Sequence, residues 1–130
     1  MTGKSLLLVD DEAALVELMK KFLERNGLQV RACTDPAAAL QLVEAGPAQF
    51  WLVVTDLTLP GMSGEELIER IRAVSPGLPA IIASGYPYQP RMQGVEFLQK
   101  PFLPKALLDL IQRMLSLQSG AASNTNPGNR

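Results

Sequence analysis

The sequence predicts an α/β domain built on a doubly wound, five-stranded parallel sheet with helices on both faces. Short apolar runs alternate along the chain with segments whose apolar residues repeat at helical spacing. This alternation is typical of strand–helix–strand units joined by right-handed crossovers. The runs are continuous rather than interrupted by polar residues, as expected of parallel strands buried on both faces.

Ordinary helix and turn signals bound the expected elements. Strands are predicted at residues 5–9, 28–33, 50–54, 80–83 and 95–98. Between them, Asp35-Pro36 caps and begins one helix, Ser63 and Glu66 form the capping box of another, and a last helix follows Pro104. The first helix ends at Gly27, and its expected apolar face consists of Leu15, Leu18, Met19, Phe22 and Leu23.

The connection between the last two strands, residues 85–94, is expected to lack a full helix. A helical return along a five-residue strand needs roughly eleven residues. The available segment is shorter than that and contains Pro87 and Pro90, which oppose helical geometry. The fourth crossover helix is therefore predicted to be short or absent. Tyr86, Tyr88 and Met92 are then available to cover the sheet in its place.

Composition limits the function classes. With 130 residues, of which 47% are hydrophobic, the chain can build one core, predicted to lie within residues 1–118, followed by a disordered tail over 119–130. The net charge of −1 and the absence of a basic run argue against direct nucleic-acid or membrane binding. No apolar run approaches the length needed to span a bilayer.

Histidine is absent from the chain and cysteine occurs once, as Cys33. The usual Ser/His and Cys/His catalytic pairs and histidine metal ligation are therefore excluded. Cys33 falls in an apolar run, so we interpret it as a buried core thiol that cannot form an internal disulfide. This cysteine usage is compatible with a reducing compartment, and a cytoplasmic location is expected.

Polar and charged residues stand at the ends of four predicted strands. Asp10 and Asp11 follow the first strand, Asp56 the third, Ser84 the fourth and Lys100 the fifth. Each residue alone has an ordinary explanation, as a helix cap, a turn residue or a solvated lysine. The carboxyl ends of parallel strands meet at one edge of the sheet, where ligands bind in such folds. Their joint placement therefore favours a functional site.

Three clustered carboxylates repel one another unless a cation compensates them. Ligation by oxygen alone points to Mg²⁺ or Mn²⁺. With such a cation and Lys100, the charges of Asp10, Asp11 and Asp56 sum to zero, so the site tolerates a phosphoryl group that bare carboxylates would repel. Ser84 can donate a hydrogen bond to one phosphoryl oxygen while Lys100 pairs with another.

Four segments resemble, in order, the signature segments of response-regulator receiver domains of two-component signalling. They are residues 7–12 (LLVDDE), 55–64 (TDLTLPGMSG), 84–86 (SGY) and 100–102 (KPF). The resemblance covers about residues 5–117, and its wording is closest to receivers of hybrid histidine kinases. It implies a flavodoxin-like sheet of order 2-1-3-4-5 and a signalling domain that catalyses only its own phosphorylation and dephosphorylation, rather than an enzyme.

The same resemblance implies the role of each site residue. Asp56 would be the phosphoacceptor, and Lys100 would contact the phosphoryl group. Mg²⁺ (or Mn²⁺) would be bound directly by Asp11, Asp56 and the backbone carbonyl of Thr58, and by Asp10 through a metal-bound water; Ser84 and Phe97 would be the switch residues. The implied partner is a histidine kinase or a histidine phosphotransfer domain, and the resemblance to hybrid-kinase receivers is compatible with a place in a longer hybrid kinase.

Two alternatives share the predicted architecture. A flavodoxin-like binding module would place a loop rich in Gly, Ser and Thr after the first strand, where this chain has Asp10-Asp11-Glu12. An aspartyl-phosphate phosphatase would use an Asp-x-Asp arrangement and a cap domain to hold its substrate. Here Asp56 is followed by Leu57 and Thr58, and no cap domain is evident. Retained flavin absorbance or multiple-turnover hydrolysis of phosphate esters would favour one or the other.

Overall fold

A five-stranded parallel sheet forms the centre of the computed structural model, which describes residues 4–123, with side chains up to residue 117. The strand order is β2-β1-β3-β6-β7, and every neighbouring pair is parallel. In chain order the strands are β1 (Ser5–Val9), β2 (Val30–Cys33), β3 (Phe50–Asp56), β6 (Ala80–Ser84) and β7 (Val95–Gln99). Counted among these five strands, the order is 2-1-3-4-5, so the predicted fold class is confirmed.

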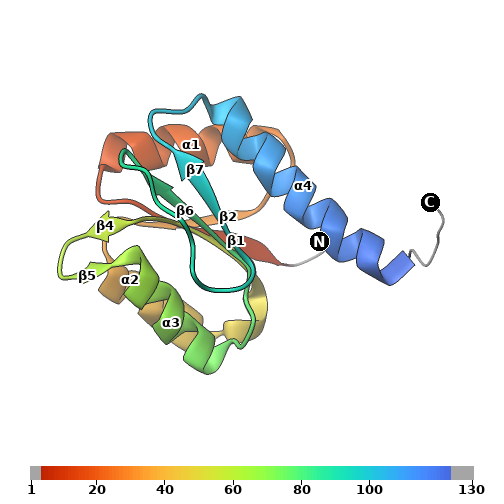
Figure 1. The fold of residues 1–130 in the computed structure, drawn as a ribbon, viewed down its shortest axis with the longest axis horizontal. Helices are drawn as coiled ribbons and strands as arrows, with labels where there is room; N and C mark the ends of the chain where they lie inside the picture. Colours follow the sequence, from red (N-terminus) through yellow and green to blue (C-terminus); the bar gives the residue numbers. More distant parts are fainter. Residues whose placement is uncertain (1–3, 124–130) are drawn as a thin grey trace.

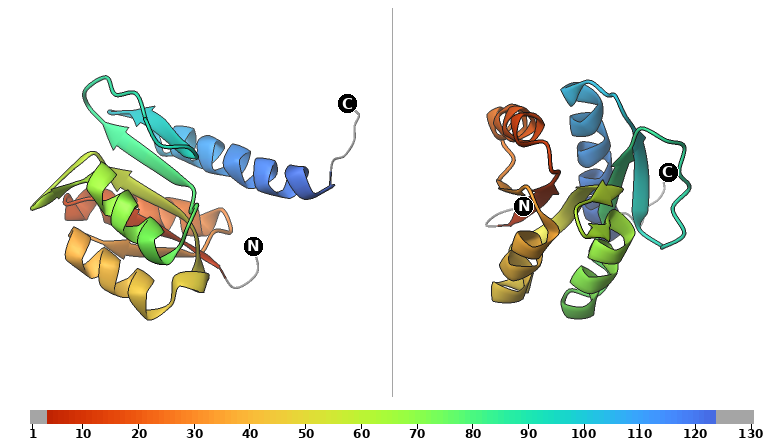
Figure 2. Two further views of the ribbon diagram at one scale, coloured as in Figure 1. Left: turned by 60° about the horizontal axis from the view of Figure 1, so that its bottom comes forward. Right: turned by 90° about the vertical axis from the view of Figure 1, so that its left-hand side faces the viewer.

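Helices cover both faces of the sheet, as Figures 1 and 2 show. One face carries α1 (Ala13–Arg25) and α4 (Pro104–Ser123), and the other carries α2 (Pro36–Ala45) and α3 (Gly64–Val74). A single 3₁₀ turn, Pro47–Gln49, leads into β3. Successive residues of a strand point to opposite faces, so Leu6 and Leu8 of β1 join one buried cluster while Leu7 and Val9 join the other.

The predicted helix starts are confirmed by their capping bonds. The side chain of Asp35 accepts a hydrogen bond of 2.9 Å from the backbone N–H of Ala38. At the start of α3, the Ser63 hydroxyl accepts one of 3.1 Å from the N–H of Glu66. Each bond satisfies a donor that has no partner within its own helix.

The predicted apolar face of α1 is wrong at Leu18, whose side chain is 56% exposed. The helix instead buries Val16, Met19 and Leu23. Consecutive helical residues differ by about 100°, so a contact face centred on Met19 turns Leu18 toward solvent. Leu15 and Phe22 pack at the margin of the core.

A short antiparallel hairpin follows β3, and the sequence analysis did not foresee it. It pairs β4 (Thr58–Leu59) with β5 (Met62–Ser63). Pro60 and Gly61 form its turn, and Gly61 has a φ of +82°. Proline followed by a residue of positive φ is typical of a type II turn, and glycine adopts that φ without strain. The hairpin leads the chain from the sheet edge directly into α3.

The crossover from β6 to β7, residues 85–94, contains no helix, as its prolines predict. The described part of the chain has four α-helices, and the fourth, α4, is not short: it is the long helix expected after Pro104. Tyr88 and Met92 pack against the buried cluster on the α2 and α3 face. Tyr86 does not cover the sheet as expected, because it lies just beyond the end of β6 and is 77% exposed.

The C-terminal helix continues to Ser123, beyond residue 118, where the sequence analysis expects a disordered tail to begin; the boundary of that tail stays a prediction. Extending an existing helix adds one hydrogen bond per residue and needs no new nucleus. The helix α4 can therefore continue beyond the last residue of its apolar repeat. Residues 124–130 of the predicted tail lie outside the described residues. No helix in the part of the chain that the structure describes is long and apolar enough to cross a membrane.

We predict that the crossover amides exchange with solvent far faster than those of β6. Residues 87–94 are all described, and none of their N–H groups donates a hydrogen bond to a backbone carbonyl. Strand β6, by contrast, is paired with β3 on one side and with β7 on the other. Hydrogen exchange followed by mass spectrometry or NMR measures both segments in one experiment. Protection across 87–94 equal to that of β6 would contradict the irregular crossover.

Candidate functional site

The carboxyl edge of the sheet brings two carboxylates and one ammonium group together. Asp10 follows β1, Asp56 ends β3 and Lys100 follows β7. Lys100 Nζ lies 2.9 Å from Asp10 Oδ2 and 3.4 Å from Asp56 Oδ2. The Asp10 carboxylate is buried and the Lys100 side chain is 19% exposed. The sequence prediction that these distant residues meet at one sheet edge is correct.

Asp11 completes an acidic triad at this edge. Asp10, Asp11 and Asp56 each offer a carboxylate oxygen, and the three atoms lie within 4.8 Å of one another. Asp11 is exposed, Asp10 buried and Asp56 between the two. Oxygen ligands in a cluster of this kind suit a hard divalent cation. The triad is therefore consistent with a metal site.

Both oxygens of Asp10 already accept hydrogen bonds. Oδ1 accepts from the backbone N–H of Glu12 at 2.9 Å, and Oδ2 accepts from Lys100 Nζ. Glu12 itself is more distant, with Oε1 3.9 Å from Lys100 Nζ. Asp10 is thus fixed in orientation before any ligand arrives.

The charges of the site shift the pKa of two groups. Burial raises the pKa of Asp56, and the opposing attraction of Lys100 does not cancel the increase, to which the charge of Asp10 also contributes. For Lys100, burial works against the charged form, but the hydrogen bond and charge of Asp10, followed by those of Asp56, outweigh it and raise the pKa. Lys100 is therefore a fixed cation facing an excess of carboxylates.

The backbone of Asp56 is held between β6 and the start of α3. The N–H of Leu57 donates to the carbonyl of Ala83 at 2.8 Å, and the N–H of Gly64 donates to the carbonyl of Leu57 at 2.7 Å. A Cβ atom on Gly64 would lie 2.3 Å from the Asp56 carbonyl oxygen. Only glycine permits this approach, so Gly64 is a site residue that the sequence analysis missed. Its signal was a glycine directly after a helix-capping serine.

Ser84 and Lys100 are neighbours through the backbone. Ser84 is buried at the end of β6, and its carbonyl accepts a 2.8 Å hydrogen bond from the N–H of Lys100. Its hydroxyl oxygen accepts a 3.0 Å hydrogen bond from the N–H of Tyr86. Thr58 lies two residues after Asp56, exposed in β4. The structure therefore places these residues at the predicted edge.

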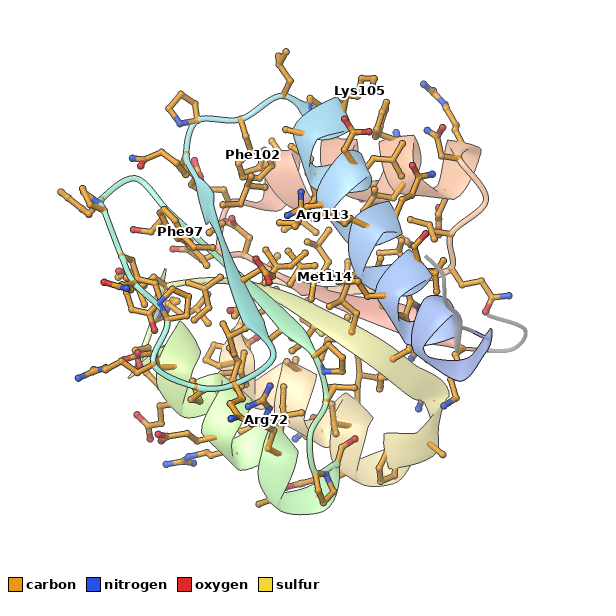
Figure 3. The ribbon with its side chains drawn as sticks, turned by 45° about the vertical axis from the view of Figure 1, so that its right-hand side comes forward. Arg72, Phe97, Phe102, Lys105, Arg113 and Met114 are labelled. Carbon is orange, nitrogen blue, oxygen red and sulfur yellow. The ribbon has the colours of Figure 1, made fainter. Side chains whose placement is uncertain are left out.

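Phe97 lies apart from the acidic triad, on the side of β7 that faces the crossover. Its ring is half-buried, and its centroid is 6.1 Å from that of Tyr88 with the planes inclined at 60°. Figure 3 shows the Phe97 side chain between β7 and the crossover. The hydroxyl of Tyr88 donates to the carboxylate of Glu65 in α3. The sequence analysis anticipated neither contact, because no local pattern pairs residues so far apart.

A groove opens beside the site on the α1 side. It has a volume of about 450 Å³, and Phe102, labelled in Figure 3, packs there against the core cluster of α1 and α4. Its lining combines apolar side chains with two charged groups of the site, and consists of Glu12, Leu15, Met19, Gly85, Lys100, Pro101 and Phe102.

Replacing Gly64 with alanine should destabilise the fold by about 1–3 kcal/mol, because the new methyl group collides with backbone that cannot rotate away. Urea unfolding monitored by circular dichroism measures the change. Gly85→Ala is the matched control, since a Cβ there meets nothing within 4 Å and should alter stability by no more than about 0.5 kcal/mol. Equal effects of the two substitutions would contradict the assigned contact.

Asp56→Asn should stabilise the protein at pH 7 in the presence of EDTA. Because the pKa of Asp56 is raised in the folded state, the folded protein holds this proton more tightly than the unfolded chain. The free energy of unfolding then falls as the pH rises from the ordinary pKa of 3.8 to the pKa of Asp56 in the folded protein. Above that pKa the full loss of stability is reached.

Urea midpoints of both proteins at pH 7 and near pH 4 measure this effect. The advantage of Asp56→Asn should shrink at the lower pH, where a larger fraction of wild-type Asp56 holds its proton because its pKa is raised. Any packing change caused by the amide is present at both pH values, so an advantage independent of pH would contradict the electrostatic explanation.

Comparison with known proteins agrees with this geometry. The family model described as response regulator receiver domain matches residues 6–112. The transcriptional regulatory protein CssR of Bacillus subtilis (strain 168) is 33% identical over 119 residues, covering 87% of this chain and 52% of CssR. The response regulator protein FleR of Pseudomonas aeruginosa is 36% identical over 113 residues, covering 82% of this chain and 24% of FleR. The chain thus spans about half or less of the length of these relatives.

Among solved structures, the receiver domain of the hybrid histidine kinase CckA superposes with a TM-score of 0.78 at 29% identity, covering 85% of this chain and 98% of that one. A CheY-like receiver domain protein from Methanospirillum hungatei gives a TM-score of 0.79 at 29% identity, covering 91% and 98%. The family match, the sheet order and the acidic pocket with its lysine agree. The chain belongs to the response regulator receiver domain family and is a phosphoacceptor signalling module rather than an enzyme.

Proposed function

We propose that this domain accepts a phosphoryl group on Asp56 from the phosphohistidine of a histidine kinase or a histidine phosphotransfer domain, in a reaction that requires Mg²⁺. A carboxylate oxygen of Asp56 forms the new P–O bond while the P–N bond of the donor breaks and the imidazole leaves. The observation that carries the proposal is the Lys100 ammonium between Asp10 and Asp56, beside an acidic triad whose oxygens lie within 4.8 Å.

Asp56 is the proposed acceptor because its neighbours are otherwise engaged. Both oxygens of Asp10 accept hydrogen bonds, and Asp11 lies exposed at the rim. Asp56 ends the central strand, and its backbone is fixed on two sides by Leu57 and Gly64. A fixed backbone holds the carboxylate in position for attack, which is the main contribution a protein makes to phosphoryl transfer.

The proposed metal ligands are Asp11, Asp56 and the backbone carbonyl of Thr58, with Asp10 acting through a metal-bound water. An indirect role for Asp10 is supported by its two carboxylate oxygens, because each already accepts a hydrogen bond. When bound, Mg²⁺ or Mn²⁺ neutralises charge between the acceptor carboxylate and the incoming phosphoryl group. Lys100 already faces the same space and supplies the remaining positive charge.

After transfer, Lys100 is proposed to pair with one phosphoryl oxygen and Ser84 to donate to another. The Ser84 hydroxyl accepts from the N–H of Tyr86, which leaves its own proton available to donate. Movement of Ser84 toward the phosphoryl group and the accompanying rearrangement of Phe97 constitute the proposed switch.

The helix that bears the donor histidine is proposed to dock on the α1 side of the site. The groove of about 450 Å³ reaches Lys100, so a side chain entering from it approaches Asp56. Two exposed leucines belong to the segments that line the groove: Leu18 on α1 is 56% exposed and Leu103, next to Phe102, is 76% exposed. An apolar groove that reaches Lys100, whose ammonium lies 3.4 Å from Asp56 Oδ2, suits a helix that presents a phosphohistidine.

Incubation with Mg²⁺ and acetyl phosphate should label Asp56 alone. Reductive trapping with borohydride and peptide mass spectrometry locate the adduct, and Asp56→Asn should abolish it. Labelling at another residue, or undiminished labelling of Asp56→Asn, would overturn the proposal.

Two further variants in the same assay separate the roles of the metal ligands and the lysine. Asp11→Ala should weaken Mg²⁺ binding, measured by titration calorimetry, and should slow labelling in proportion. Lys100→Ala should leave Mg²⁺ binding no weaker but should still slow labelling, because it removes positive charge from the phosphoryl position rather than a metal ligand. Labelling rates unchanged in both variants would contradict this division.

A further inference from the structure

Side-chain hydrogen bonds anchor the irregular crossover, residues 85–94, and one of them runs from Gln99 Nε2 to the Gly85 carbonyl at 3.1 Å. At its start, the N–H of Tyr86 donates to the Ser84 hydroxyl oxygen at 3.0 Å. Near its middle, the Tyr88 hydroxyl donates to the Glu65 carboxylate. Arg91 also approaches Glu65 at 3.5 Å, but its side chain is 82% exposed, and exposed ion pairs contribute little. The Tyr88 bond is therefore the main polar contact between the crossover and α3.

Tyr88 contacts both β7 and α3. Its ring packs against Phe97 of β7, while its hydroxyl reaches Glu65, the second residue of α3. Gly64, which precedes Glu65, packs directly on the Asp56 carbonyl. One side chain thus spans from the proposed switch aromatic to the helix that is fixed against the proposed phosphoacceptor.

The raised pKa of Tyr88 keeps its hydroxyl protonated across the physiological pH range. Burial, followed by the hydrogen bond to Glu65, raises the pKa of Tyr88 to about 12. The hydroxyl therefore keeps its proton and remains a donor. The acceptor is a carboxylate group, and hydrogen bonds to carboxylates are among the stronger ones in proteins.

We propose that Tyr88 is a positioning residue for the phosphorylation site: its bond to Glu65 holds the crossover and Phe97 in the resting arrangement and opposes the movement of Ser84 toward the phosphoryl group. This inference rests on the proposed function. A movement of Ser84 would pull on Tyr86, because the Tyr86 N–H is hydrogen-bonded to the Ser84 hydroxyl. Tyr88, two residues later, is bonded to Glu65 of α3 and resists that movement. Phosphoryl binding must therefore work against the Tyr88 bond.

A contact made in the resting state and weakened in the active state lowers the apparent affinity for any ligand that selects the active state. Removing the Tyr88 hydroxyl should therefore favour activation. Tyr88→Phe keeps the ring against Phe97 and deletes only the hydrogen bond. Beryllofluoride, which mimics the phosphoryl group on an aspartate, is the probe.

With Mg²⁺ present, Tyr88→Phe should bind beryllofluoride about three- to tenfold more tightly than wild type, the ratio expected from losing one hydrogen bond. Its affinity for Mg²⁺ alone should not change, which separates this role from general destabilisation. Hydrogen exchange across residues 85–94 should be faster without ligand. Glu69→Gln is the control, because it removes an acid from the exposed side of the same helix and should match wild type.

A double-mutant cycle identifies the partner. Glu65→Ala should tighten beryllofluoride binding as Tyr88→Phe does, and the double variant should bind no more tightly than either single one. Equal beryllofluoride affinity of wild type and Tyr88→Phe, or fully additive effects in the cycle, would overturn the proposed role of Tyr88 and leave the proposed function intact. A wild-type protein that does not bind beryllofluoride would overturn the proposed function and this inference with it.

Discussion

The contact of Lys100 with Asp10 and Asp56 is the interaction on which the site depends. Two carboxylates from adjacent strands face each other at the sheet edge, and their repulsion would open that edge without a cation between them. The ammonium group lies within 3.4 Å of both. It arrives on β7, two strands away from β3, so its position requires the whole sheet to form in order. The charge balance of the site therefore depends on the strand order of the whole sheet.

Membership of the receiver family decides between the functions that the sequence left open for this architecture. The fold alone would also suit a flavodoxin-like binding module, and a nucleophilic aspartate would also suit a phosphatase. The family match over residues 6–112 and the acidic edge with its lysine select the signalling module. The acids after β1 explain why a bare phosphate-binding loop is incompatible with this edge: Asp10 and Asp11 present negative charge where such a loop would present N–H groups.

The parts of the structure that follow from short-range patterns could be predicted from the sequence. The strands, the caps at Asp35 and Ser63, and the meeting of Asp10, Asp56 and Lys100 all follow from apolar periodicity and from the rule that parallel strands end at one edge. The prolines at 87 and 90 likewise indicated a crossover without a helix.

Features set by contacts between distant segments could not be predicted. The outward rotation of Leu18 depends on which side of α1 meets the sheet. The link from Tyr88 to Glu65 and the exposure of Tyr86 depend on the path of a loop that no repeat governs. The helical residues 119–123 follow from the propagation of α4 rather than from any apolar face. The requirement for glycine at position 64 becomes evident only when the carbonyl of Asp56 is placed against it.

The length of α4 gives the domain a mechanical property. The helix starts four residues after Lys100 and runs through twenty residues, about 30 Å at 1.5 Å per residue, and its far end extends beyond the sheet in Figure 1. Its first residue lies beside the acidic edge, so a rotation of the helix about that end moves the far end most. A rotation of only about 5° at the first residue moves the far end by roughly 2.6 Å over that length. A rotation that changes the packing around Lys100 very little therefore corresponds to a displacement of a few ångströms at the far end of α4.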